Sequence, residues 1–160
     1  MEKYEILIKE AKQYINTADH LCYVTFPNVN DNKIILAIAE NIYVAMVSAM
    51  ESLLLYEKEF KRIYTLPEAF DLKFDLFKST ISKRYNLDRN FVFTMDELRR
   101  LLQLHKRSQM EFNRKGSYII LADDFKLKSI NIGKIKQYLE YAKPFVSNVD
   151  VILRKSYKIK

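Results

Sequence analysis

The sequence contains very little cysteine, glycine or proline. Among its 160 residues there are one cysteine, two glycines and three prolines, while hydrophobic residues make up 49%. The single cysteine, Cys22, excludes an intramolecular disulfide and a metal site built from cysteines. Such a composition argues against disorder and against an all-β fold rich in turns. We therefore expect one helical domain over residues 1–160, long enough to bury a core without covalent cross-links.

The motifs of common enzyme classes are also missing. The sequence has no glycine-rich phosphate loop, no HExxH metal motif and no GxSxG nucleophile elbow. Its two histidines, His20 and His105, are few for a metal site. The sequence therefore predicts no metal and no cofactor.

The most hydrophobic segment, residues 34–56, is long enough to cross a membrane. It contains Glu40 and Glu51, whose carboxylates would be costly in the hydrocarbon layer. A buried helix of a bundle is the better interpretation, so we expect no membrane partner. The residues after Met1 do not resemble a signal peptide, and the lone cysteine suits a reducing compartment. These features favour a cytoplasmic location.

Charge is distributed unevenly along the chain, whose formal net charge is +7. Residues 1–60 carry 5 basic and 9 acidic side chains, whereas residues 61–160 carry 22 and 11. A basic half is typical of proteins that bind nucleic acid, anionic lipid or an acidic partner. General use of lysine by thermophilic or AT-rich organisms gives the same pattern. The charge alone does not separate these two explanations.

Hydrophobic periodicity predicts an all-α, up-and-down bundle of about five helices with a small β-hairpin before the last helix. Steps of three and four between apolar residues place helices over residues 2–23, 32–62, 68–85, 94–114 and 132–153. Thr94 and Glu97 have the spacing of a capping box, and Gly116 suits a helix end. Two β-favouring runs on either side of Asp123 and Asp124 predict the hairpin. The last helix should stay in phase across Pro144 as one kinked helix.

The fourth of these helices has the most unusual side chains. His105 interrupts its apolar stripe, in a segment with six basic residues: Arg99, Arg100, Lys106, Arg107, Arg114 and Lys115. Histidine among arginines is the minimum for metal-free RNA cleavage, in which the imidazole moves a proton and an arginine stabilises the phosphorane. The alternative is a structural histidine, hydrogen-bonded to Glu111, a tyrosine or a carbonyl, beside a solvated basic face.

This segment resembles the mark of the HEPN superfamily, an arginine, usually followed by a polar residue, with a histidine a few positions further on. Arg100 and His105 enclose four residues, and Arg99 and His105 enclose five. Leu101 replaces the usual polar residue. An alternative alignment starts at Arg107 and puts Asn113 in place of the histidine, which implies a non-catalytic site. The resemblance implies a short helical bundle, commonly dimeric, that is either a metal-independent ribonuclease or a binding module.

Three functions follow from these features. The first is a binding protein that contacts RNA or another polyanion through the basic residues around His105. The second is a HEPN-type ribonuclease of a toxin or defence system, with His105 as general acid or base and Arg100 or Arg99 at the phosphate. The third is a protein-interaction module, in which the apolar seam of the last helix forms a homodimer or partner interface.

Overall fold

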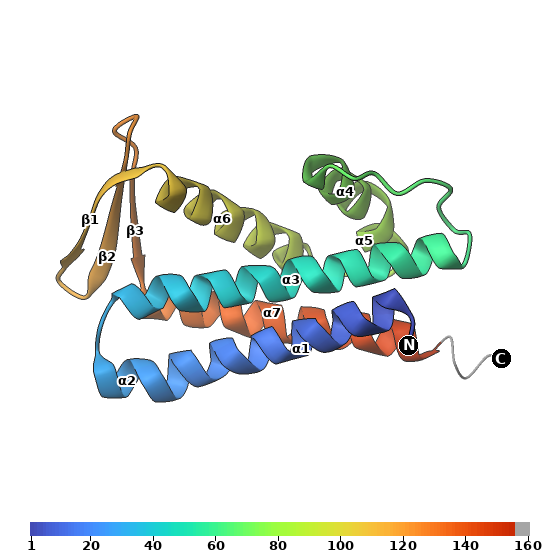
Figure 1. Cartoon of the computed structure of the whole chain (residues 1–160), viewed down its shortest axis with the longest axis horizontal. Helices are drawn as coiled ribbons and strands as arrows, with labels where there is room; N and C mark the ends of the chain where they lie inside the picture. The colour runs from blue at the N-terminus through green and yellow to red at the C-terminus, as the bar shows by residue number, and fades with distance from the viewer. Residues whose placement is uncertain (156–160) are drawn as a thin grey trace.

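A computed structural model describes residues 1–155 of the chain (Figure 1). This part is mostly helical, with a small antiparallel sheet before the last helix, which confirms the predicted helical class. The described helices and strands, with η marking π-helical turns, are α1 (Lys3–His20), η1 (Leu21–Thr25), α2 (Phe26–Val29), α3 (Lys33–Glu59), α4 (Phe70–Leu76), η2 (Phe77–Ile81), α5 (Ser82–Arg84), α6 (Arg89–Lys106), β1 (Ser108–Arg114), β2 (Ser117–Ala122), β3 (Leu127–Asn131) and α7 (Ile132–Lys155).

Helices α1, α3 and α7 run side by side along the length of the molecule and form most of the core (Figure 1). Small residues let α1 and α3 approach closely, because Ala11 of α1 and Ala45 and Ala49 of α3 are fully buried. Ser52 is also fully buried, and its hydroxyl donates a 2.6 Å hydrogen bond to the carbonyl oxygen of Tyr4. This polar residue of α3 therefore joins two helices.

Helix α3 is the one helix of the described chain that is long and apolar enough to cross a membrane. Its neighbours in the fold account for that composition, since most of its apolar side chains are buried against α1, α6 and α7. Helix α7 is continuous through Pro144, as predicted. The third predicted function uses the apolar seam of this helix as an interface. In the structure the seam is buried inside the chain, at Ile135, Leu139, Ala142, Val146, Val149 and Leu153. That seam is therefore not available as a dimer face.

The segment after α3 folds over the bundle as one continuous helical run of α4, η2 and α5 over residues 70–84, which confirms a helix close to the predicted bounds of 68–85. An ion pair attaches it to α3, because the guanidinium of Arg84 lies 2.6 Å from the carboxylate of Glu57. Glu57 is fully buried, and Arg62 is a second cation at 3.8 Å. The π-helical turn places Phe77 and Ile81 in the core.

Helix α6 begins earlier and ends earlier than the sequence predicts. Its N-cap is Asp88, whose carboxylate accepts a 2.9 Å hydrogen bond from the backbone N–H of Asn90. Thr94, predicted to cap the helix, is buried in its second turn. The helix ends at Lys106, and residues 108–114 form a strand. The predicted helix over residues 94–114 is therefore wrong in its last third.

A three-stranded antiparallel sheet, in the order β1–β2–β3, replaces the predicted two-stranded hairpin. The predicted hairpin corresponds to β2 and β3, and β1 is the additional strand. Lys115 and Gly116 form the two-residue turn between β1 and β2, both with positive φ (48° and 80°), as a type I′ turn requires. Gly116 therefore closes a hairpin rather than a helix. The sheet lies at one end of the bundle, beside the ends of α6 and α7 (Figure 1).

Candidate nucleic-acid interface

Three of the six predicted basic residues form ion pairs with acidic side chains of the described chain: Arg99, Arg100 and Arg107. The guanidinium of Arg99 lies 2.6 Å from the carboxylate of Asp71 and 4.5 Å from the ring centre of Phe70. These contacts join α6 to α4. Arg100 is exposed and pairs with Asp96 one turn earlier on the same helix, at 3.1 Å. Intrahelical pairs of this kind are weak, so Arg100 is less constrained than Arg99.

His105 lies in the last turn of α6, and its side chain is 34% exposed. Its Nδ1 atom is 2.8 Å from the Oε2 atom of Glu111 on β1. The same carboxylate accepts hydrogen bonds from the hydroxyls of Ser108 and Tyr118, the latter at 2.8 Å. This is the hydrogen-bonded histidine that the structural alternative describes, with Glu111 as its partner.

The three donors around Glu111 determine its protonation. Burial raises the pKa of this carboxyl, but the hydrogen bonds from Ser108, Tyr118 and His105 outweigh burial and hold the pKa below its ordinary value. Burial and the adjacent Glu111 carboxylate together raise the pKa of Tyr118 to about 12. Glu111 is therefore ionised and Tyr118 neutral near pH 7. The carboxylate holds the end of α6 against the sheet.

The arginine and histidine of the predicted motif lie on different sides of α6. His105 is five positions after Arg100, which at 100° per residue places the two about 140° apart around the helix axis. Arg99 is about 120° away on the other side. Within one copy of the chain, Arg100 pairs with Asp96 and His105 with Glu111. Arg107 is nearer the sheet and lies 3.6 Å from Asp124.

The remaining basic residues lie at the two ends of β1. Lys106 and Arg107 precede the strand, and Arg114 and Lys115 end it. Lys106, Arg114 and Lys115 are exposed, and no acidic partner is found for them among residues 1–155. A strand of this length separates the two basic ends by about 20 Å. The structure thus replaces the predicted basic helix with two basic ends of one strand.

Between those two ends, the outward face of the sheet is apolar. Successive strand residues alternate between faces, so Met110, Phe112 and Arg114 point away from the core while Glu111 points toward α6. Met110 and Phe112 are 57% and 38% exposed. On β3, the similarly placed Leu127, whose cross-strand partner on β2 is Leu121, is 61% exposed. An exposed apolar area beside unpaired cations is a typical binding surface.

Phe125, in the turn between β2 and β3, is unusual in both its exposure and its backbone conformation. Its side chain is 82% exposed, and its φ is +63°. A bulky residue in the left-handed region is rare, because the Cβ atom clashes with the backbone. The aromatic ring also gains little from burial within the chain. Both features cost stability.

The sequence contains a signal for this surface that the helix prediction missed. In Ser108–Arg114, apolar residues alternate with polar ones at 110 and 112, and Lys115-Gly116 suits a tight turn. The strong helical pattern of residues 98–105 hid this change of period, since good helix formers continue through 107–111. Phe125 had no signal beyond its position beside the acidic turn.

Comparison of the chain with known proteins assigns no role to this surface, because no family model, no curated protein and no solved structure matches the chain. The described residues contain no group of three or more His, Cys, Asp or Glu side chains placed to hold a metal ion. The function must therefore be argued from the surface itself.

Proposed function

We propose that the protein binds single-stranded RNA on the sheet face, defined here as Met110, Phe112, Leu127 and Phe125 with the cations Lys106, Arg107, Arg114 and Lys115. The observation that carries the proposal is the position of the exposed side chains of Met110 and Phe112 on β1. They lie between Lys106 at one end of the strand and Arg114 and Lys115 at the other, three cations that have no acidic partner among residues 1–155. Unstacked bases bind to aromatic side chains, and basic residues beside them bind the phosphates.

Electrostatics supports RNA over an uncharged partner. The half of the sequence that forms the sheet is strongly basic, while the acidic excess lies in residues 1–60. Phosphate binding releases counterions, so such a surface attracts RNA most strongly at low salt. The two basic ends of β1, about 20 Å apart, suit an extended chain of phosphates that runs along the strand.

The ring positions support the single-stranded form. Phe112 on β1 and Phe125 in the β2–β3 turn present exposed faces to which bases can stack. Base–aromatic stacking tolerates any base, because each base has a π face, and contributes about 1–3 kcal/mol per base. A duplex keeps its bases stacked inside and gains little from these rings. The proposal thus predicts a preference for single strands without strong sequence specificity.

The test is fluorescence anisotropy with a labelled single-stranded RNA of about 20 nucleotides, near the upper site size of small single-strand-binding modules. The double variant Arg114→Glu/Lys115→Glu should weaken binding by about tenfold or more, since two phosphate contacts become repulsive. The matched control is Lys9→Glu/Lys58→Glu, which makes the same charge change at exposed lysines of α1 and α3. Equal loss in both variants would show only an effect of net charge and would refute a specific surface.

RNA cleavage is a second candidate, favoured by one observation. The imidazole of His105 is oriented by Glu111 and is one-third exposed, which is the arrangement of a general base or acid held by a carboxylate. Incubation of RNA in EDTA with the wild type and His105→Ala tests this function. Cleavage by the wild type alone supports it, and the same cleavage by both proteins refutes a role for His105.

A further inference from the structure

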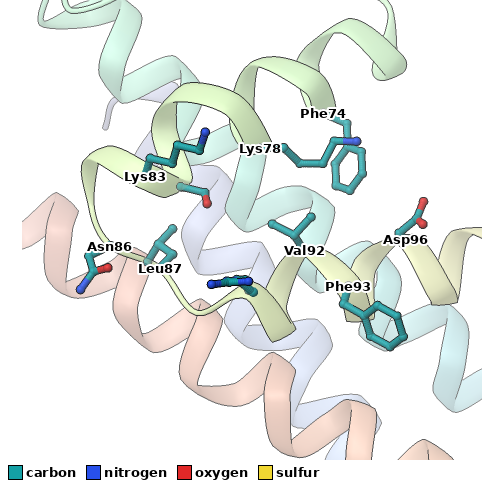
Figure 2. Close-up of a pocket in the computed structure, with 10 residues that line it drawn as sticks. Phe74, Lys78, Lys83, Asn86, Leu87, Val92, Phe93 and Asp96 are labelled. Atoms are coloured by element: carbon teal, nitrogen blue, oxygen red, sulfur yellow. The ribbon is translucent and has the colours of Figure 1, made fainter.

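A pocket of about 570 Å³ lies at the opposite end of α6 from the sheet. Its walls come from the α4–η2–α5 segment on one side and from the first turns of α6 on the other (Figure 2). Helix α6 separates it from the sheet by about 25 Å, given the rise of 1.5 Å per residue. The pocket therefore belongs to neither the sheet face nor the His105–Glu111 pair.

The floor of the pocket is apolar. Phe74 is 4% exposed, and Leu87 and Val92 are half-buried between the two walls (Figure 2). Phe93, 56% exposed, extends the apolar surface along α6. Pockets that bind small molecules have volumes of about 300–1,000 Å³ and are lined mainly by such side chains. This cavity has the size and lining of that class.

Three cations surround the mouth: Lys78, Lys83 and Arg89. Lys78 lies 4.7 Å from the ring centre of Phe74 and 3.4 Å from Asp75. Lys83 and Arg89 are exposed, and neither has an acidic partner within residues 1–155. The one carboxylate of the lining, Asp96, already pairs with Arg100 at 3.1 Å. The mouth therefore has an excess of positive charge over an apolar floor.

We propose that this pocket binds a small amphipathic anion, with an apolar body on Phe74, Leu87 and Val92 and a single carboxylate or phosphate head group between Lys83 and Arg89. Charge complementarity selects the head group, because the lining has two unpaired cations and its one carboxylate, Asp96, already pairs with Arg100. The apolar floor selects the body, since an inorganic anion leaves that surface in water. The site is independent of the proposed RNA binding.

The probe is 8-anilinonaphthalene-1-sulfonate, an aromatic anion whose fluorescence rises in apolar surroundings. Titration of the full chain should give saturable binding that Val92→Trp abolishes by filling the cavity. Lys83→Glu/Arg89→Glu should weaken binding by about tenfold, because two attractive charges become repulsive. Competition with decanoate and with phenyl phosphate separates an acyl carboxylate from an aryl phosphate, and displacement by either supports the proposal.

Two controls keep the result specific to this pocket. Phe125→Ser removes an exposed ring of the sheet face, and binding of the probe should be unchanged. Circular dichroism melting establishes that each variant is folded, and Leu87→Trp is the substitute if Val92→Trp does not fold. Unchanged binding in both the cavity-filling and the charge-reversal variants overturns the proposal, as does binding that only Phe125→Ser removes.

Discussion

The Oε2 atom of Glu111 lies 2.8 Å from the Nδ1 atom of His105, so a carboxylate of β1 holds the imidazole at the end of α6. The contact spans the point at which the chain changes from helix to strand. Ser108 and Tyr118 donate to the same carboxylate. The pair therefore has a structural role in docking the sheet, whether or not His105 also acts on a ligand.

The Glu111 carboxylate makes stability depend on pH. Hydrogen bonds hold its folded-state pKa below the ordinary value of 4.5. The unfolded chain therefore takes up a proton first as the pH falls, and this part of the stability is present above the unfolded pKa and lost as the pH falls through the folded pKa. As the pH decreases below about 4.5, the melting temperature of the wild type should decrease, and that of Glu111→Gln should decrease less steeply. Thermal denaturation at several pH values measures both, and parallel curves would contradict the assignment.

Replacement of Phe125 by glycine should raise the stability of the protein and weaken its RNA binding. Phe125→Gly removes the clash of a side chain at positive φ, so we expect the protein to become more stable by about 0.5–1 kcal/mol. The same change should weaken RNA binding, because a stacking ring is lost. Urea denaturation and fluorescence anisotropy measure the two effects on one variant. A less stable variant with full RNA affinity would refute a binding role for this ring.

The buried Glu57 should make Arg84 important for stability. Arg84→Met removes the cation 2.6 Å from a fully buried carboxylate, leaving Arg62 at 3.8 Å as the nearest remaining cation. Loss of one partner of a buried pair costs about 3 kcal/mol or more. The adjacent Lys83→Met, at an exposed lysine, should change the free energy of unfolding by less than about 0.5 kcal/mol. Similar effects of the two variants in urea denaturation would mean that Glu57 is already satisfied without Arg84.

The core around Phe145 should be intolerant of truncation. The ring is fully buried and lies 5.8 Å from the ring centre of Phe77 and 5.2 Å from that of Phe91, which joins α7 to η2 and α6. Phe145→Ala should lower the free energy of unfolding by about 3–5 kcal/mol, because it leaves a cavity where three segments meet. Chemical denaturation measures the loss. A cost below about 1 kcal/mol would mean that the surrounding helices can collapse into the space.

Much of the fold could be predicted because long helices have a strong periodic signal. The seam of α7 continues through Pro144, and the apolar faces of α3 mark it as the central helix. The end of α6 could not be predicted, because the residues after His105 are good helix formers and their pairing with β2 depends on residues 3 to 14 positions further along the chain. The capping box at Thr94 was misleading for a related reason, since Asp88 caps the helix earlier.

The sequence contains the basic residues of the candidate surface but not their geometry. The ion pair of Arg99 with Asp71 depends on how α4 and α6 pack, whereas the pair of Arg100 with Asp96 lies within α6. The helix prediction placed Arg114 on a helix, whereas β1 places it beside Phe112 on one face of the sheet. Which cations remain unpaired is a property of the tertiary structure, and sequence spacing does not contain it.

The salt dependence of RNA binding tests the central claim most directly. For a single strand, the logarithm of the affinity falls against the logarithm of salt with a slope of about −0.7 per phosphate contact. Arg114→Ala/Lys115→Ala should make the slope shallower by about 1.4. Arg99→Ala/Arg100→Ala should leave the slope nearly unchanged, because both arginines lie on α6, outside the sheet face, and pair with Asp71 and Asp96. The reverse order of effects, or binding that does not depend on salt, would contradict the sheet face as the RNA-binding surface.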